Sequence, residues 1–450
     1  MNWNNNIWFC ILMFMVMYVN AQEDLSKSEA IALALQHNFG ILVASNDVKI
    51  AENNKDILNS GFLPTVSTTA GANYTQQTTV TGFPGVIDQN TGEPRPDIEI
   101  PNAETQRYNA SVNLAYTLFD GMGRYYNYKR LKEQYNLSEL EARETIENTI
   151  VQLFTVYYEV ARLTQNTEIL EETLTISRER LMRADYQFEY GQNSKLDVLN
   201  AQVDVANDSI NLISINQQLK NTKRDLNVLL ANKINNDFKV DTTVTFIPKL
   251  LLEQYITSAP ENNVTLLQNQ SIIEISAYDL KVSKSGYLPT VGLVGSYGWN
   301  ENRNPASVFF PGNISDSYTF SAGINLSWNL FDGGTTSTLV QNSKIALSSQ
   351  EIARNQIEME VERDIANALG NYQNRLEVLE IQRQNVLTNE TNFSRSRERY
   401  NLGQITAIEF RQAQINLILA ETNLNAAKYD AKIAELQLLQ LTGQLLNVEF

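Results

Sequence analysis

The chain contains 450 residues, of which 43% are hydrophobic and 19% are charged. This balance excludes a disordered chain and a helical protein with many membrane spans. The 51 acidic and 35 basic residues give a formal net charge of −16, which argues against a nucleic-acid partner because phosphates are bound by clustered Lys and Arg.

The first 21 residues have the pattern of a secretory signal peptide. An apolar stretch at 7–19 leads to the small residue Ala21, and this stretch is too short for a retained membrane anchor. It contains Cys10, the single cysteine of the chain. We therefore expect a secreted mature chain without disulfides, thiolate metal sites or a cysteine nucleophile.

The remaining chain is an internal duplication. Residues 60–66, Ser-Gly-Phe-Leu-Pro-Thr-Val, recur 225 positions later as Ser-Gly-Tyr-Leu-Pro-Thr-Val at 285–291. Residues 113–121, which end in Leu-Phe-Asp-Gly, recur 212 positions later at 325–333. The difference between the two offsets falls in a single loop. The sequence predicts two structural repeats with the same order of elements, 22–240 and 241–450.

Each repeat is expected to open with a helix and to continue with two strands around a loop. Phe320, Ile324 and Leu326 lie on one side of an alternating pattern whose other side is small and polar. This period of two fits a strand of a soluble sandwich and also a membrane-spanning barrel strand. The expected opening helices are 25–59 and 262–284, and the expected strands and loops are 63–74, 75–107 and 108–119 in the first repeat and 288–299, 300–317 and 318–331 in the second.

Four such strands in one chain pose a problem of closure. Bacterial barrels begin at about eight strands, and lipid does not tolerate an open sheet edge. Either the strands lie outside a membrane or several chains pool them. Aromatic residues near the strand ends fit a membrane interface, and they are Tyr74, Tyr116, Tyr297, Trp299 and Trp328.

A long helical hairpin completes each repeat, at 122–231 and at 334–441. Its first arm contains no proline and almost no glycine, and the apolar residues step by four and three, which is the spacing of a coiled coil. Each hairpin is expected to turn near Gly191 or Gly403. A plain coiled-coil rod would show the same helical pattern, so only the strands distinguish this protein from such a rod.

Duplicated motifs carry a resemblance to a known family. They are Leu-Pro-Thr-Val at 63–66 and 288–291, Leu-Phe-Asp-Gly at 118–121 and 330–333, and the hairpin tips at 186–202 and 399–414. In this order, in a secreted chain, they resemble the TolC family of outer-membrane efflux proteins. The resemblance implies a mostly α fold with a small β part, in which the long helical hairpins form a periplasmic tunnel. It also implies a homotrimer, in which each chain contributes four transmembrane strands to a shared twelve-stranded barrel.

A function follows from the same resemblance. The protein would be a passive exit duct in the outer membrane of a Gram-negative bacterium, serving a tripartite efflux or type I secretion system. A periplasmic adaptor protein and an inner-membrane pump would dock at its inner end, and lipid would surround the barrel. Two alternatives remain: a periplasmic coiled-coil adaptor or spacer without a pore, and a secreted enzyme on a helical scaffold. The alternating strand at 318–331 speaks against the spacer.

Two groups of residues are expected to shape the joints and the tips. Proline ends a helix, aspartate caps one, and glycine permits a sharp turn. The joints between helices and strands are therefore expected at Pro64, Pro289, Asp120, Gly121, Asp332 and Gly333. The resemblance implies adaptor contacts at the tips, at Tyr190, Gly191, Gln192, Leu402, Gly403 and Gln404.

Asp197 and Glu409 lie six residues beyond the tip glycines, where the family commonly places acidic residues near the narrow end of the pore. In a trimer they would form rings of negative charge that bind cations or gate through ion pairs with Arg399 or Arg411. Ordinary exposed carboxylates are the alternative. A double ring is placed in doubt by two residues that stand where some relatives carry a further acid, Asn200 and Gln412.

The sequence shows no catalytic or cofactor site. His37 is the single histidine, so a Cys/His dyad and a histidine-based metal cluster are both ruled out. The glycines at 121–123 and 333–334 lack the Gly-Lys-Ser/Thr of a phosphate-binding loop. We therefore expect no enzyme activity, no cofactor and no metal.

Overall fold

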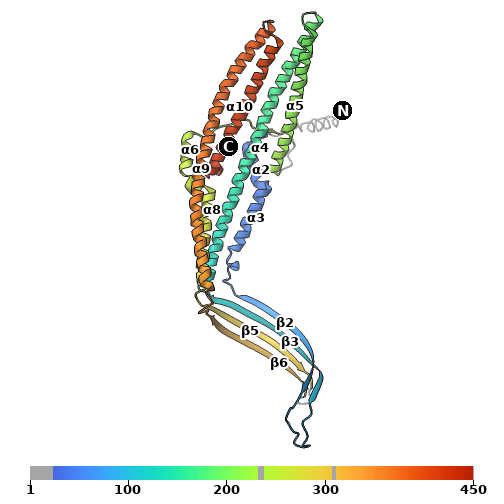
Figure 1. Ribbon diagram of the computed structural model, residues 1–450, viewed down its shortest axis with the longest axis vertical. Coiled ribbons are helices and arrows are strands. Elements are labelled where there is room, and N and C mark those ends of the chain that lie inside the picture. The colour runs from blue at the N-terminus through green and yellow to red at the C-terminus, as the bar shows by residue number, and fades with distance from the viewer. Residues whose placement is uncertain (1–23, 232–237, 307–310, 449–450) are drawn as a thin grey trace, which may run out of the picture. The chain divides into compact units, whose positions relative to one another are not determined.

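The computed structural model describes residues 24–231, 238–306 and 311–448, and 66% of these residues are helical. The remainder includes a small antiparallel sheet (Figure 1). The predicted signal peptide at 1–21, with Cys10, lies outside the described residues. The chain divides into two compact units. We call the described residues of 1–50, 136–271 and 352–450 the helical unit. We call those of 51–135 and 272–351 the sheet unit.

Two long hairpins dominate the helical content. The first is α4 (Gly123–Glu189) with α5 (Lys195–Leu229), and the second is α9 (Thr335–Asn401) with α10 (Ala407–Leu441). Both ends of α9 and α10 lie 212 positions beyond those of α4 and α5, so the duplication extends to the helix ends. The described residues include no helix with both the length and the apolar character that a membrane crossing requires. The shorter helices are α2 (Lys27–His37), α3 (Phe39–Asn54), η1 (Ile57–Asn59), α6 (Lys249–Thr257), α7 (Ala259–Asn262), α8 (Val264–Ser285) and η2 (Leu445–Asn447).

Two asparagines interrupt the opening helices at equivalent positions. Asn38 separates α2 from α3, caps the first turn of α3 with its side-chain oxygen, and donates from its side-chain nitrogen to Leu229 O at 2.9 Å. Asn263, 225 positions later, caps α8 and donates to Leu441 O at 2.8 Å. Because such local bonds compete with a continuous helix, the segment predicted as one helix at 25–59 contains two α-helices and a short 3₁₀ turn.

An aromatic core holds α4 against α10 inside the helical unit. Tyr158 and Tyr429 are buried and stacked, with ring centroids 5.5 Å apart. The neighbouring Tyr157 hydroxyl donates to Leu25 O at 2.7 Å and accepts the N–H of Asp241 at 2.8 Å. Burial raises the pKa of Tyr157 to about 12, so this hydroxyl keeps its proton at neutral pH. Its two hydrogen bonds therefore hold the parallel pair of β1 (Asp24–Leu25) and β4 (Lys239–Val240) against the core.

The sheet unit contains one four-stranded antiparallel sheet in the order β2–β3–β5–β6 (Figure 1). Its strands are β2 (Thr65–Thr81), β3 (Ile98–Phe119), β5 (Thr290–Asn304) and β6 (Asn313–Ser327). The inner strands β3 and β5 are paired on both sides. The outer strands β2 and β6 each have one edge without a strand partner among the described residues.

The strand ends differ from the sequence pattern. β2 continues to Thr81 and β3 begins at Ile98, so the first loop is 82–97 instead of 75–107. β5 ends at Asn304 and β6 begins at Asn313, instead of at 299 and 318. Polar residues break the apolar alternation in these extensions of the strands. The backbone hydrogen bonds, which pair Thr75 with Thr105, do not depend on apolar side chains. β6 ends at Ser327, short of the predicted 331.

Proline, aspartate and glycine form the joints inside the sheet unit. β2 and β5 start directly after Pro64 and Pro289. The carboxylates of Asp120 and Asp332 accept backbone N–H groups in the first turns of α4 and α9, at 2.9 and 2.8 Å. Gly333 has a φ of +71°. At Gly121 the φ is +68° and a Cβ would lie 2.6 Å from a carbonyl oxygen, so only glycine fits there.

Candidate functional site

The cross-strand register assigns the paired residues of the sheet to two faces. Val66 faces Leu114, Leu114 faces Gly295, and Gly295 faces Ala322. Side chains alternate along each strand, so residues two positions away share this side, which we call the apolar face. It also carries Val112, Tyr116, Leu293, Tyr297, Trp299, Tyr318, Phe320 and Ile324. The polar face carries Ser67, Asn109, Ser111, Asn113, Ser296, Asn300, Ser321 and Asn325.

The apolar face has a limited height. On β5 it runs from Val291 to Trp299, and the next residue on this face is Glu301, which faces Asp316. Nine residues rise about 30 Å along a strand. At a tilt of about 40° they would cover about 23 Å, close to the ~25 Å apolar band of membrane barrels. The two cross-strand pairs on this face that precede Glu301 and Asp316 consist of aromatic residues. Tyr297 faces Phe320, and Trp299 faces Tyr318.

The two hairpin tips in the helical unit have the same backbone. Gly191 and Gly403 adopt φ values of +69° and +73°, and a Cβ at either would meet nothing within 4 Å. The residues after them, Gln192 and Gln404, close the turns by donating N–H bonds of 2.7 and 2.8 Å to carbonyls of α4 and α9. The residues before them present large exposed side chains, with Tyr190 79% and Leu402 72% exposed. Each tip therefore displays an apolar group beside a rigid turn.

Both predicted ring carboxylates cap the helices that return from the tips. The Asp197 carboxylate accepts the N–H of Ser194 at 3.1 Å, and the Glu409 carboxylate accepts that of Thr406 at 2.8 Å. Each pair forms a capping box at the start of α5 or α10. The bonds from the Thr406 backbone and hydroxyl, together with the charge of Arg399, lower the pKa of Glu409. The pattern Ser/Thr-x-x-Asp/Glu was visible in the sequence but was not read as a cap.

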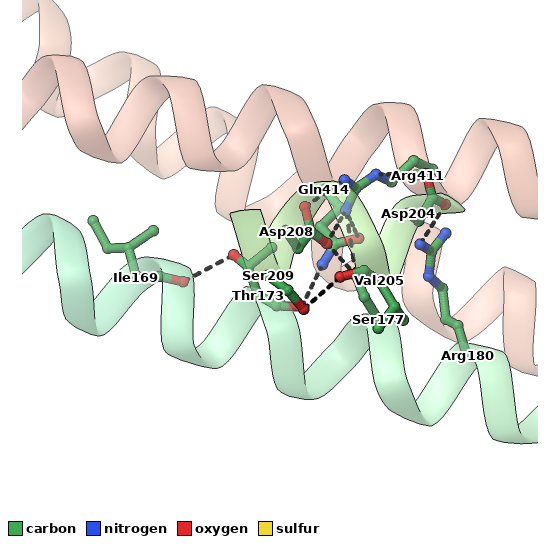
Figure 2. Close-up of polar contacts among 10 residues, drawn as sticks. All are labelled: Ile169, Thr173, Ser177, Arg180, Asp204, Val205, Asp208, Ser209, Arg411 and Gln414. Atoms are coloured by element: carbon green, nitrogen blue, oxygen red, sulfur yellow. Dashed lines mark hydrogen bonds and ion pairs between the residues drawn. The ribbon is translucent and has the colours of Figure 1, made fainter. Parts of the chain in front are cut away.

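Arg411, a predicted partner of the ring carboxylates, instead bonds to Asp208 on α5. Its guanidinium donates to both carboxylate oxygens, at 2.6 and 2.9 Å. Ser177 on α4 donates to the same carboxylate at 2.6 Å, and Asp208 is only 3% exposed. Asp204, one turn away, bonds to Arg180 of α4 at 2.7 Å (Figure 2). This Arg411 cluster links the second hairpin to both helices of the first.

Four of the six candidate gate residues line one cavity between the two hairpins near their tips, and Glu409 and Arg399 do not. Its volume is about 450 Å³, and charged groups of both signs border it. The predicted residues in its wall are Asp197, Asn200, Arg411 and Gln412, and those that the sequence did not disclose include Arg180 and Asp204. The side-chain nitrogen of Gln412 donates to the side-chain oxygen of Asn416 on the same helix at 2.8 Å. The cavity offers polar and ionic contacts.

Metal ligands are not clustered in the part of the chain that the structure describes. No group of three or more His, Cys, Asp or Glu side chains could hold an ion there. His37 is exposed at the end of α2.

The chain matches known outer-membrane proteins. The profile of the family described as outer membrane efflux protein matches residues 30–232 and 255–444. The outer membrane protein TolC of Vibrio cholerae is 21% identical over 388 residues, covering 86% of this chain and 83% of that protein. The outer membrane efflux protein BepC of Brucella suis is 22% identical over 341 residues, covering 74% and 72%. The solved CmeC outer membrane channel of Campylobacter jejuni shares the fold, with a TM-score of 0.73 at 16% identity, covering 93% of this chain and 86% of that one.

Proposed function

The chain belongs to the outer membrane efflux protein family, and from this premise we propose that it forms a homotrimeric exit duct. Its place is the outer membrane of a Gram-negative bacterium. Solutes would pass from a tunnel built by the helical hairpins into a barrel built by the sheets. Passage through the duct is passive, and the energy comes from an inner-membrane pump that a periplasmic adaptor joins to the hairpin tips.

The observation that carries this proposal is the sheet with its two unlike faces and two open edges. An apolar face about 23 Å high suits lipid, and a face of Ser, Thr and Asn suits a water-filled lumen. Open edges are not tolerated in lipid, and four strands are too few to close a barrel. Three copies supply twelve strands, which lie within the range of known barrels.

The periplasmic spacer is the competing reading, and the sheet argues against it. A spacer without a pore has no use for an aromatic-rimmed apolar face such as that of β5 and β6. A secreted enzyme is disfavoured because the described residues include no cluster of metal ligands. Relatives of this chain are outer-membrane efflux channels.

Reconstitution of the purified mature chain into planar bilayers tests the duct, with the oligomer mass taken in detergent. We expect a trimer that gives stepwise conductance. A monomer or dimer that stays soluble without detergent and does not conduct would reject the duct and favour the spacer.

The tip carboxylates extend the proposal. We place Asp197 and Glu409 of three copies around the inner end of the pore, where their capping bonds hold them in fixed positions. A rigid, ionised carboxylate is suited to attract cations at a narrow opening. The exposed groups at the tips, Tyr190 and Leu402 with their neighbouring glycines and glutamines, are then the contacts offered to the adaptor.

A further inference from the structure

The internal duplication determines how the sheets of neighbouring copies join, given the homotrimer proposed above. The edges that need partners are β2 and β6. Every neighbouring pair in the sheet is antiparallel, so β6 of one copy runs antiparallel to β2 of the next. Direction alone leaves the register open, and register decides which side chains meet.

The two repeats have the same strand register within the chain. In the first hairpin Thr65 faces Ala115, and in the second Thr290 faces Ser327. Thr290 lies 225 positions after Thr65, and Ser327 lies 212 positions after Ala115. These are the offsets of the repeated sequence motifs. The offsets therefore relate equivalent positions in space as well as in sequence.

The junction between the repeats supplies the template for the junction between copies. Inside the chain, the second strand of repeat one meets the first strand of repeat two, and Leu114 faces Gly295. Moving Leu114 forward by 212 gives Leu326 on β6, and moving Gly295 back by 225 gives Ala70 on β2. We infer that Leu326 of one copy faces Ala70 of the next, which places Ser327 opposite Thr69.

The faces of the sheet provide a first check of this register. Leu326 and Ala70 both belong to the apolar face, and Ser327 and Thr69 both belong to the polar face. A shift by one residue would join the apolar face of one copy to the polar face of the next. The inferred register therefore continues lipid-facing and lumen-facing surfaces around the whole barrel.

The end of β6 provides a second check. In the first repeat β3 continues to Phe119, which faces Val291 of β5. In the second repeat β6 ends at Ser327, and Leu330 and Phe331 are 80% and 88% exposed. The β3–β5 pairing contains a bulge between Thr117 and Phe119, and the same bulge in β6 places Phe331 opposite Val66 of the next copy. Closure thus gives the stretch at 328–331 a partner and extends β6 to the end that its sequence predicts.

Paired cysteines test the register in a Cys10→Ser background. Leu326→Cys with Ala70→Cys places thiols on the apolar face, and Ser327→Cys with Thr69→Cys places them on the polar face. Both faces are needed because only one carries the closer, non-hydrogen-bonded pairs. Shifted controls combine Leu326→Cys with Tyr74→Cys and Ser327→Cys with Asn73→Cys, four residues or about 13 Å away on the same face.

The trimers are oxidised in detergent and run on a non-reducing gel. Two strands separate β2 from β6 within a copy, so these bonds form only between copies. We expect at least one matched pair to give covalent trimers in at least tenfold excess over its shifted control. Preferential linkage of a shifted pair, or no linkage in trimers of confirmed mass, overturns the register alone. Absence of any trimer by mass overturns the homotrimer itself, and the register with it.

Discussion

At the level of single residues, Glu409 combines a helix cap with a fixed charge. Bonds from Thr406 and the charge of Arg399 lower its pKa below the ordinary 4.5, so it stays ionised at neutral pH. We expect Glu409→Gln with Asp197→Asn to keep the caps, because an amide oxygen still accepts a hydrogen bond. The same changes remove six charges from the proposed trimer and should lower its cation preference severalfold. The reversal potential in a salt gradient measures this preference.

A matched control and a pH series sharpen this experiment. Glu377→Gln makes the same chemical change at an exposed position of α9 away from the tip and should leave selectivity unchanged. The contribution of Glu409 should persist as the pH falls to 4.5 and disappear only below it, because its pKa is lowered. Selectivity equal to that of the unmodified protein would reduce both carboxylates to ordinary caps.

Arg411 and Asp208 form a buried ion pair between the hairpins, at 2.6 Å. Removing one partner of a buried pair costs about 3–5 kcal/mol, because the other charge stays buried alone. We expect Arg411→Met to speed hydrogen exchange in α5 and α10 roughly a hundredfold, which corresponds to about 3 kcal/mol. The double change Arg411→Met with Asp208→Leu should recover much of the protection. Equal exchange in the single and double variants would contradict a coupled pair.

Sequence reasoning reached some of these residues and not others, for physical reasons. Asp197 and Glu409 were identified as tip carboxylates, but their capping role was not predicted, although Ser194 and Thr406 stand three residues before them. The bond from Arg411 to Asp208 was not predicted either, because 203 residues separate the two and only the packing of α10 on α5 brings them together. Local signals identify local bonds, while long-range ion pairs need the fold.

At the level of elements, Glu421 makes the packing of α10 sensitive to pH. Burial and the charges of Glu172 on α4 and Glu390 on α9 raise its pKa from 4.5 to about 7. Between these values the folded state binds more protons than the unfolded state, so the free energy of unfolding falls as the pH rises from about 4.5 to 7. We expect Glu421→Gln to flatten this slope. Thermal unfolding in detergent at several pH values checks it, and an unchanged slope would assign the dependence to other groups.

The tip turns give a prediction about docking. Gly191 and Gly403 need positive φ, but no neighbour crowds a Cβ at either position. Asparagine tolerates this conformation far better than a β-branched residue. We expect Gly191→Asn with Gly403→Asn to keep trimers and tip structure yet lose efflux, because the added side chains stand where the adaptor would bind. Drug accumulation in cells measures efflux, and a gel measures trimers.

A second pair of variants separates docking from folding. Gly191→Val with Gly403→Val adds backbone strain of about 1–2 kcal/mol per turn and should loosen the tips as well, which hydrogen exchange detects. Full efflux in the asparagine variant would remove these glycines from the proposed adaptor contact.

The strands show where pattern reading stops. Alternation located the apolar segments of β3 and β6, because one side of each strand is apolar. It missed the polar extensions to Thr81 and from Ile98, which are held by backbone bonds that any residue can make. It also predicted 318–331 as a strand, whereas β6 ends at Ser327 in the single chain. The residues at 328–331 favour a strand, and under the proposed closure the partner of that strand belongs to another copy.

At the scale of the whole molecule, duplication is the property that the sequence disclosed best. Offsets of 225 and 212 positions reproduce the helix ends, the strand register and the bonds of Asn38 and Asn263. Assembly was not legible in the same way. Its support is that four strands are too few to close a barrel and that the sheet of a single chain has two open edges.

Adjacent residues on opposite faces of β6 test the assembly. Ile324 lies on the apolar face, and Asn325 lies on the polar face. An arginine facing lipid near the bilayer midplane costs about 2–4 kcal/mol, and a trimer would carry three. We expect Ile324→Arg to remove most folded trimer from the outer membrane, while Asn325→Arg assembles normally and shifts the selectivity toward anions. Trimer yield in isolated outer membranes and bilayer recordings measure the two effects. Normal assembly of Ile324→Arg would show that this face does not meet lipid, and the duct would lose the observation that supports it most.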